Sequence, residues 1–163
     1  MVGQRSRATR RAVRFDSLEQ EVFLNVWRTY DRLRILEDEV FSRFGLTAQQ
    51  YNVLRLLRSS RPESVQTLTL ANRLVSRAPD ITRMLDKLEE CGWIQRERTV
   101  DDRRVVRVRI SRSGLALLDA IASPLDECHA RQLGHLSAAD LKKLCTLLKA
   151  ARGPHEGEES HWR

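Results

Sequence analysis

The chain has 163 residues, of which 41% are hydrophobic and 31% are charged, and its formal net charge at pH 7 is +7. These proportions are typical of a globular protein with one core, and no apolar run is long enough to cross a bilayer. Three widely spaced cysteines give no disulfide framework, and the basic start of the chain lacks the apolar stretch of a secretory signal. We therefore expect a cytoplasmic protein without a membrane segment.

The positive charge is concentrated in two places. Residues 1–14 contain five arginines and no acid, and residues 64–114 contain eleven basic and seven acidic side chains. These segments contribute +5 and +4, so the remaining residues sum to −2 and the total is +7. A basic arm and a basic block are typical of a protein that binds phosphates, although a solubilising surface is the alternative interpretation.

The first 60 residues predict a flexible arm and two helices. Residues 1–14 show no apolar periodicity, whereas Asp16 and Ser17 can cap a helix that runs to about Arg43. Thr47 and Gln50 form a capping box for a second helix. The apolar residues of the two helices recur at helical spacing: Val22, Val26, Trp27, Tyr30, Leu33, Val40, Phe41, Phe44, Val53, Leu54 and Leu57.

Two shorter helices are expected next. One lies near residues 65–74, with Leu68, Ala71 and Leu74 facing inward. The other starts between Ser76 and Pro79, ends at Glu90 before Gly92, and has a core-facing side. Its inward residues are Ile81, Met84, Leu85 and Leu88.

The period then changes from helical to alternating, which predicts two strands at residues 93–99 and 105–110 with a charged tip between them. Ser111 caps a long helix that Pro124 should kink or interrupt. Ser137 and Asp140 cap a last helix, whose inward residues are Leu141, Leu144, Leu148 and Ala151, and residues 153–163 read as a mobile tail. The expected fold is mainly α with a small β-hairpin wing.

Two short helices followed by a charged hairpin make a winged helix-turn-helix, at about residues 46–114. The N-terminal part of the second helix normally reaches base edges in the major groove, where Arg83 can contact guanine and Thr82 a base or a phosphate. The hairpin tip can place arginines in the narrow minor groove. The candidate DNA-binding residues are Arg77, Pro79, Asp80, Thr82, Arg83, Lys87, Asp102, Arg103 and Arg104. A solvated helix face and a self-neutralising turn are the alternatives for these two features.

Several of these motifs resemble the MarR-type regulators. The resemblance is carried by LTAQQYNVL at residues 46–54, by ITRMLDKLEECGWI at residues 81–94, and by Arg96. The wing is similar too, since Asp102 and Arg104 match the family's Asp-x-Arg and lead into a strand and a nearby glycine. Ser111 stands where the family usually has threonine. The similarity extends over roughly residues 18–151.

The resemblance implies a homodimer that binds a pseudopalindromic operator. Residues 15–152 would form the MarR-like domain, with dimerisation helices at about 16–44 and 115–152. At the matching positions, the resemblance implies that Arg104 enters the minor groove and that Asp102 orients Arg104. Many relatives are repressors that a small phenolic or aromatic ligand releases from DNA, so we expect a small-molecule effector.

The residues of an effector pocket are a separate hypothesis. Aromatic residues at helical spacing more often belong to a core, but polar-tipped rings and nearby arginines could hold an anionic aromatic ligand. The candidates are Trp27, Tyr30, Arg34, Tyr51 and Arg55.

Other functions have less support. The chain lacks the Walker, HExxH, GxSxG and GxGxxG motifs, so we expect neither an enzyme nor a bound cofactor. The spacing of Cys128, His129 and His135 does not suit a metal site. A winged-helix module that binds only protein remains an alternative, which the basic wing argues against.

A cysteine-based redox regulator is the other alternative. Cys128 and Cys145 lie on apolar helix stripes, where a thiol is more often inert, and Cys91 ends a helix, where the dipole disfavours a thiolate.

Overall fold

The computed structural model describes residues 14–75, 80–98, 105–157, 160 and 162. The flexible arm, Arg77, Pro79 and the three candidate tip residues (Asp102, Arg103 and Arg104) therefore lie outside the described residues, apart from Arg14 at the end of the arm. The chain divides into two units, Met1–Arg34 and Ile35–Arg163. In the described ranges, no helix is both long and apolar enough to span a membrane.

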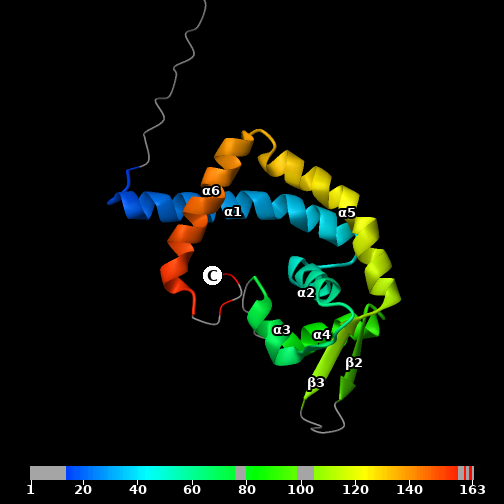
Figure 1. Cartoon of the computed structure of the whole chain (residues 1–163). Helices are drawn as coiled ribbons and strands as arrows, with labels where there is room; N and C mark the ends of the chain where they lie inside the picture. Colours follow the sequence, from blue (N-terminus) through cyan, green and yellow to red (C-terminus); the bar gives the residue numbers. More distant parts are fainter. Residues whose placement is uncertain (1–13, 76–79, 99–104, 158–159, 161, 163) are drawn as a thin grey trace, which may run out of the picture. The chain divides into compact units, whose positions relative to one another are not determined.

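The fold is mainly α with a small antiparallel sheet, which confirms the predicted fold class (Figure 1). The helices are α1 (Leu18–Arg43), α2 (Ala48–Ser59), α3 (Thr67–Arg73), α4 (Ile81–Glu90), α5 (Arg112–Leu133) and α6 (Ala138–Arg152). The strands are β1 (Val65–Gln66), β2 (Ile94–Arg98) and β3 (Val106–Ile110), and a 3-10 turn, η1 (Gly153–His155), follows α6.

The predicted helix caps are present. The Thr47 hydroxyl accepts a hydrogen bond from the Gln50 amide at 3.2 Å, and the Gln50 side chain accepts one from the Thr47 amide at 2.9 Å. Ser111 and Ser137 likewise accept hydrogen bonds from backbone amides three residues later, at 3.0 and 3.1 Å. Each cap satisfies an amide that the first helical turn leaves without a partner, so these helix starts are determined locally.

The sheet has a third strand that we did not predict. β3 is central, with β1 on one side and β2 on the other, and Val108 pairs with both Val65 and Arg96. The expected helix at residues 65–74 is therefore wrong at its start, because Val65 and Gln66 join the sheet. A strand of two residues has no period that the sequence could reveal.

The inward face of α3 is also different from the prediction. Leu68 is 73% exposed, whereas Leu70 is completely buried. Leu70 is the buried residue of α3 itself, and Leu74, which is buried as predicted, is the extended residue that follows the helix.

One apolar core holds the second unit together. Its members come from the end of α1, from α2, α3, α4 and α5, and from the sheet. The following are essentially inaccessible to solvent: Val53, Leu54, Leu57, Leu70, Leu85, Leu88, Ile94, Val108, Leu118 and Ile121. Burying each such side chain stabilises the fold by about 1.5–3 kcal/mol. The core therefore joins α3, α4 and the strands, which lie next to one another in Figure 1.

Two predictions concern the end of the chain. Of the two effects expected of Pro124, interruption is absent, since α5 continues past it as one helix, whereas the helix does bend along its length (Figure 1). The apolar residues of α6 are not inward in a single chain, since no residue of this helix is buried and Leu144, Leu147 and Leu148 are exposed. A helix can bend to accommodate a proline, at the loss of one backbone hydrogen bond.

The segment after α6 returns to the helix-turn-helix. The Trp162 indole donates a hydrogen bond to the carbonyl of Arg73 at 3.3 Å, and Arg152 donates one to the carbonyl of Trp162 at 3.0 Å. The indole thereby satisfies the last carbonyl of α3, which has no partner within its helix. We expected a mobile tail, and its mobility stays a prediction, but its described residues have defined contacts.

Gly114 is expected to be essential for the join between α5 and the sheet. A Cβ at this buried position would lie 2.3 Å from the Trp93 carbonyl oxygen and 2.8 Å from Ile110 Cγ1. Gly114→Ala should therefore destabilise the protein by about 1–3 kcal/mol, as overpacking does. Equilibrium urea unfolding at one fixed protein concentration measures this change.

Gly153→Ala is the matched control. Gly153 has a helical φ of −47°, and a Cβ there would meet no atom within 4 Å. Its substitution should change the free energy of unfolding by less than about 1 kcal/mol, with a stabilising sign. Equal losses in the two variants would contradict the crowding at Gly114.

Candidate nucleic-acid interface

The start of α4 is set by Asp80. Its carboxylate accepts a hydrogen bond from the Arg83 amide at 2.9 Å, and the helix begins at Ile81. The helix therefore starts later than the predicted window of residues 76–79. Asp80 was a candidate DNA-binding residue, but the structure gives its carboxylate a capping role, which removes one amide from competition for an anion.

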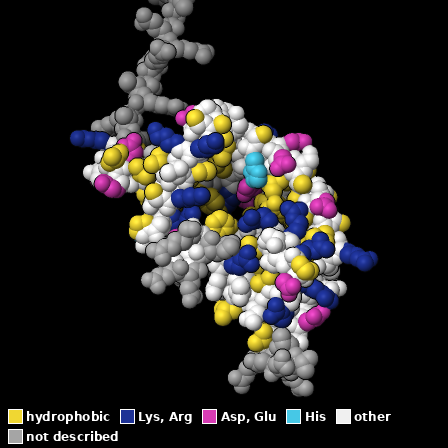
Figure 2. Space-filling view, viewed as in Figure 1, with side chains coloured by type: hydrophobic (Ala, Val, Ile, Leu, Met, Phe, Trp, Pro, Cys, Tyr) yellow, Lys and Arg dark blue, Asp and Glu magenta, His cyan; other side chains and the backbone are white. Residues whose placement is uncertain are grey.

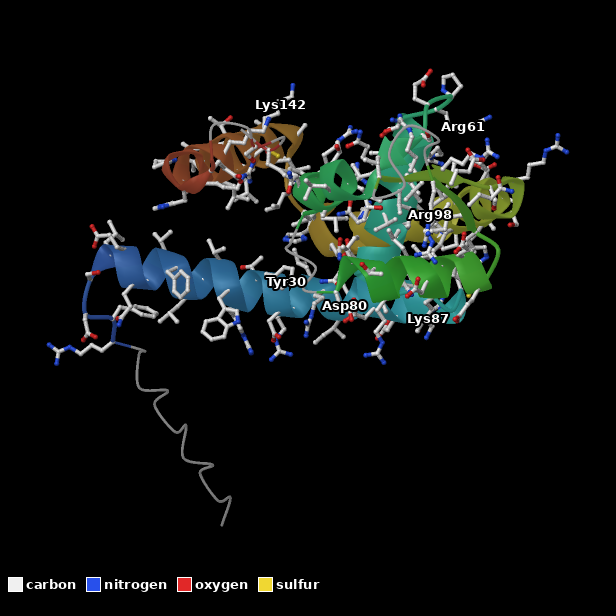
Figure 3. All side chains as sticks on the ribbon, turned by 90° about the horizontal axis from the view of Figure 1, so that it is seen from below. Tyr30, Arg61, Asp80, Lys87, Arg98 and Lys142 are labelled. Carbon is white, nitrogen blue, oxygen red and sulfur yellow. The ribbon has the colours of Figure 1, made fainter. Side chains whose placement is uncertain are left out.

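The two faces of α4 have opposite character. Leu85 and Leu88 are buried in the core, whereas Thr82, Arg83 and Lys87 are exposed. Figure 3 shows Asp80 at the beginning of this helix and Lys87 farther along it. Because Thr82 and Arg83 stand in the first exposed turn, they occupy the position from which recognition helices reach base edges.

The hairpin that follows α4 is a regular antiparallel ladder. Arg98 at the end of β2 pairs with Val106 at the start of β3, so residues 99–105 connect the two strands. Arg109 donates a hydrogen bond to Gln95 at 2.9 Å and forms an ion pair with Glu97 at 2.7 Å. These bonds hold the two strands together on the ladder that leads to the three candidate tip residues.

Hydrogen bonds also connect β3 to the residue that directly precedes β1. Arg107 donates two hydrogen bonds to Ser64, to its hydroxyl at 2.8 Å and to its carbonyl at 2.6 Å. The Arg107 side chain therefore forms hydrogen bonds within the protein, although in the sequence it is only one residue of a basic block. Figure 2 shows basic side chains over the face of the second unit that carries these elements, with acidic side chains between them.

An ion cluster joins the hairpin to α4. The Arg96 guanidinium lies 2.7 Å from Asp86 and 2.6 Å from Glu89, and its Nε donates a further hydrogen bond to Glu89 at 2.8 Å. The backbone amide of Arg96 also donates to Glu89, at 3.1 Å. These hydrogen bonds raise the pKa of Arg96 above its usual value, most strongly that to Glu89. We did not predict this pairing, although two acids three residues apart on one helix are a signal for it.

The five effector-pocket candidates fall into two groups. In the first unit, the Arg34 guanidinium lies 5.9 Å from the centroid of the exposed Tyr30 ring, and Trp27 lines a cavity of about 520 Å³ with Leu24 and Arg28. In the second unit, Tyr51 stacks on Phe41 with ring centroids 4.9 Å apart, and burial raises the pKa of Tyr51. Arg55 bonds to Asn52 at 3.1 Å. A single pocket formed by all five stays a prediction.

A second cavity lies next to the candidate recognition helix. Its volume is about 470 Å³, and its lining includes Leu68 and Ala71 of α3, Ile81 and Thr82 of α4, and Arg96 of the hairpin. The exposed Leu68 side chain thus has an apolar neighbourhood.

The three cysteines have different environments. Cys128 is buried, whereas Cys91 and Cys145 are exposed, so the prediction that Cys145 is a core residue is wrong in a single chain. Desolvation raises the pKa of Cys128. Among the residues that the structure describes, no three His, Cys, Asp or Glu side chains are grouped as a metal would require.

We expect Cys128 to resist alkylation in the folded protein, because burial both blocks the reagent and lowers the thiolate fraction. Cys91 should react with iodoacetamide in the native state, while Cys128 should react only in denaturant. Peptide mass spectrometry identifies the modified cysteines. Native-state labelling of Cys128 as fast as that of Cys91 would contradict the described environment.

Comparisons with known proteins agree with this architecture. The model of the MarR family matches residues 46–106, which include the helix-turn-helix and most of the hairpin. The regulator PecS of Dickeya dadantii is 32% identical over 85 residues, which are 52% of this chain and 51% of PecS. The chain thus matches about half the length of that relative.

Solved structures extend the match to most of the chain. A MarR transcription factor from Planctomyces limnophilus is 52% identical, with a TM-score of 0.67, and the alignment covers 84% of this chain and 99% of that one. A mutant MarR from Escherichia coli complexed with operator DNA is 25% identical, with a TM-score of 0.73 and coverage of 83% and 99%. The chain therefore belongs to the MarR family of DNA-binding transcription regulators.

Proposed function

We propose that the chain is a homodimeric repressor that recognises a pseudopalindromic DNA duplex and is released from it by a small aromatic ligand. The observation that carries the DNA-binding part is the first turn of α4, where Thr82 and Arg83 are exposed while Leu85 and Leu88 are buried. The same core carries the β2–β3 hairpin, so a groove-reading helix and a wing belong to one rigid body.

Within this proposal the exposed basic residues have different roles. Arg83 would bind a guanine edge through two hydrogen bonds, and Lys87 would bind a phosphate. Arg103 and Arg104 would enter the minor groove, with Asp102 orienting Arg104. Arg77 and Pro79 precede α4 in the sequence and would lie near the sugar-phosphate backbone of the DNA. The arginines of residues 1–14 would add phosphate contacts.

The dimer is supported by apolar side chains that are exposed in the described part of a single chain. In the first unit, Val22, Phe23 and Val26 of α1 are exposed, and in the second unit Leu144 and Leu148 of α6 are exposed. Large apolar faces of this kind mark interaction surfaces in soluble proteins. A second copy would also supply a second α4 for a two-fold symmetric operator.

The ligand-responsive part rests on the two cavities. The cavity beside α4 would couple a bound ligand to DNA reading directly, since Thr82 lines it. The cavity of the first unit contains the candidate Trp27, an aromatic surface for a ring. A ligand that binds the DNA-free state more tightly would release the operator by population shift.

Arg83→Ala tests the assignment of base reading. On a duplex selected from random sequences, the variant should lose about 1–3 kcal/mol of binding free energy, and on unselected DNA much less. Deleting residues 1–14 should instead weaken binding to every duplex and flatten its dependence on salt. Fluorescence anisotropy titrations at several salt concentrations give both quantities.

The opposite pattern, with sequence preference lost on arm deletion and kept in Arg83→Ala, would reverse these roles. Wild-type protein without any salt-dependent binding would instead favour the protein-binding alternative, because phosphate contacts always release counterions.

Leu148→Glu tests the dimer. A charge on the apolar face of α6 should dissociate the protein, whereas Leu68→Glu, at an exposed leucine of α3, should leave its oligomeric state unchanged. Sedimentation equilibrium at tens of micromolar distinguishes one chain from two. A folded wild-type monomer under these conditions would sink the proposal.

A further inference from the structure

We infer that Arg96 is a positioning residue, which fixes the orientation of the hairpin relative to α4 and compensates the negative charge of two carboxylates of α4. This inference rests on the proposed function. It starts from the four polar contacts between Arg96 and α4, which involve both Asp86 and Glu89. A single guanidinium makes three of them, and its planar, fork-shaped donor set suits two carboxylates at once.

The cluster lies where the two reading elements meet. Arg96 is the middle residue of β2 and pairs with the buried Val108 of β3, so its backbone is fixed in the ladder. Asp86 lies one turn beyond Arg83 on α4 and directly precedes Lys87. The guanidinium therefore bridges the middle of the hairpin and the part of α4 beside its exposed cations.

The apolar core and the cluster constrain different things. Leu88 and Ile94 are buried in one core, which determines that the hairpin packs beside α4. Apolar contacts are non-directional, whereas hydrogen bonds of 2.6–2.8 Å to two fixed carboxylates specify an orientation. The wing contributes to binding only if it meets the minor groove while α4 is in the major groove. The orientation of the wing relative to α4 therefore matters as much as the charge of the wing.

The cluster also governs the local charge. The side chains of Asp86 and Glu89 are 48% and 39% exposed, so without Arg96 they would be two uncompensated negative charges beside Arg83 and Lys87. Such charges would repel every duplex alike, and salt would screen the effect. Misdirection of the wing, in contrast, would penalise the selected duplex and would persist at high salt. The two consequences can thus be measured separately.

Arg96→Lys is the decisive variant, because lysine keeps the charge but cannot reproduce the fork. We expect its affinity for the selected duplex to fall about tenfold, within the range of coupled neighbours, while its affinity for random DNA changes less than about twofold. Its melting temperature should stay close to that of the wild type. A merely stabilising role would leave the ratio of selected to random affinity unchanged.

Arg109→Lys is the matched control. Arg109 also stands on the hairpin and also bonds to two side chains, Gln95 and Glu97, but both belong to β2 and neither to α4. Its substitution should leave the affinity ratio unchanged. A loss in Arg109→Lys equal to that in Arg96→Lys would overturn the inference, because the effect would then be a general one of the hairpin.

A double-mutant cycle identifies the route of the effect. If Arg96 acts by aiming the wing, Arg104→Ala should lose less affinity in the Arg96→Lys background than in the wild type. Additive losses would exclude positioning of the tip. If Arg96→Lys melts early, Glu89→Gln serves instead, because it weakens the fork from the side of α4 and should lower the same affinity ratio.

Different results would contradict the proposed function and the role of Arg96. Wild-type protein that binds no duplex in a salt-dependent way removes the proposed function and this inference together. Wild-type protein that binds the selected duplex, with Arg96→Lys and Glu89→Gln unchanged in their affinity ratio, removes only the role of Arg96.

Discussion

The burial of Leu85 and Leu88 is the constraint on which the rest of the structure depends. These residues anchor α4 in a core that also contains Leu54, Leu70 and Ile94. Because they occupy one face of a ten-residue helix, the opposite face has to carry the polar residues, and Thr82 and Arg83 are directed outward. The same apolar contacts that stabilise the fold thus expose the residues that a DNA groove would meet.

Much of this arrangement can be predicted from the sequence, because the signals are local. The capping residues Thr47, Ser111 and Ser137, and the alternation at residues 106–110, determine element ends and types within a few residues. β1 could not be predicted, because two residues carry no period and their strand exists only through pairing with β3. The burial of Leu70 in place of Leu68 could not be predicted either, because both leucines lie in α3 and only tertiary packing decides which one faces the core.

The contacts of the candidate site could be predicted less completely than the fold, for a related reason. Residue type and position along α4 identify Thr82, Arg83 and Lys87, but they do not show how charges are paired in space. Arg96 and Arg107 both belong to the basic block of the sequence, yet both are bonded within the protein. Charge in a sequence therefore overestimates the charge available to a phosphate, and only tertiary contacts show which cations are already paired.

The two parts of α1 differ in the burial of their apolar side chains. Val40 and Phe41, in the later part, are buried in the core of the second unit, whereas Phe23, Trp27 and Tyr30 in the first unit are exposed. The helix is continuous over 26 residues, so the change reflects the end of the core and not the end of a helix. Burial of an apolar helix face would stabilise the folded protein by about 25 cal/mol for each Å² of apolar surface removed from water. In the described part of the first unit, apolar side chains are therefore exposed to solvent, and in the proposed dimer a symmetric second copy would bury them and add a second recognition helix.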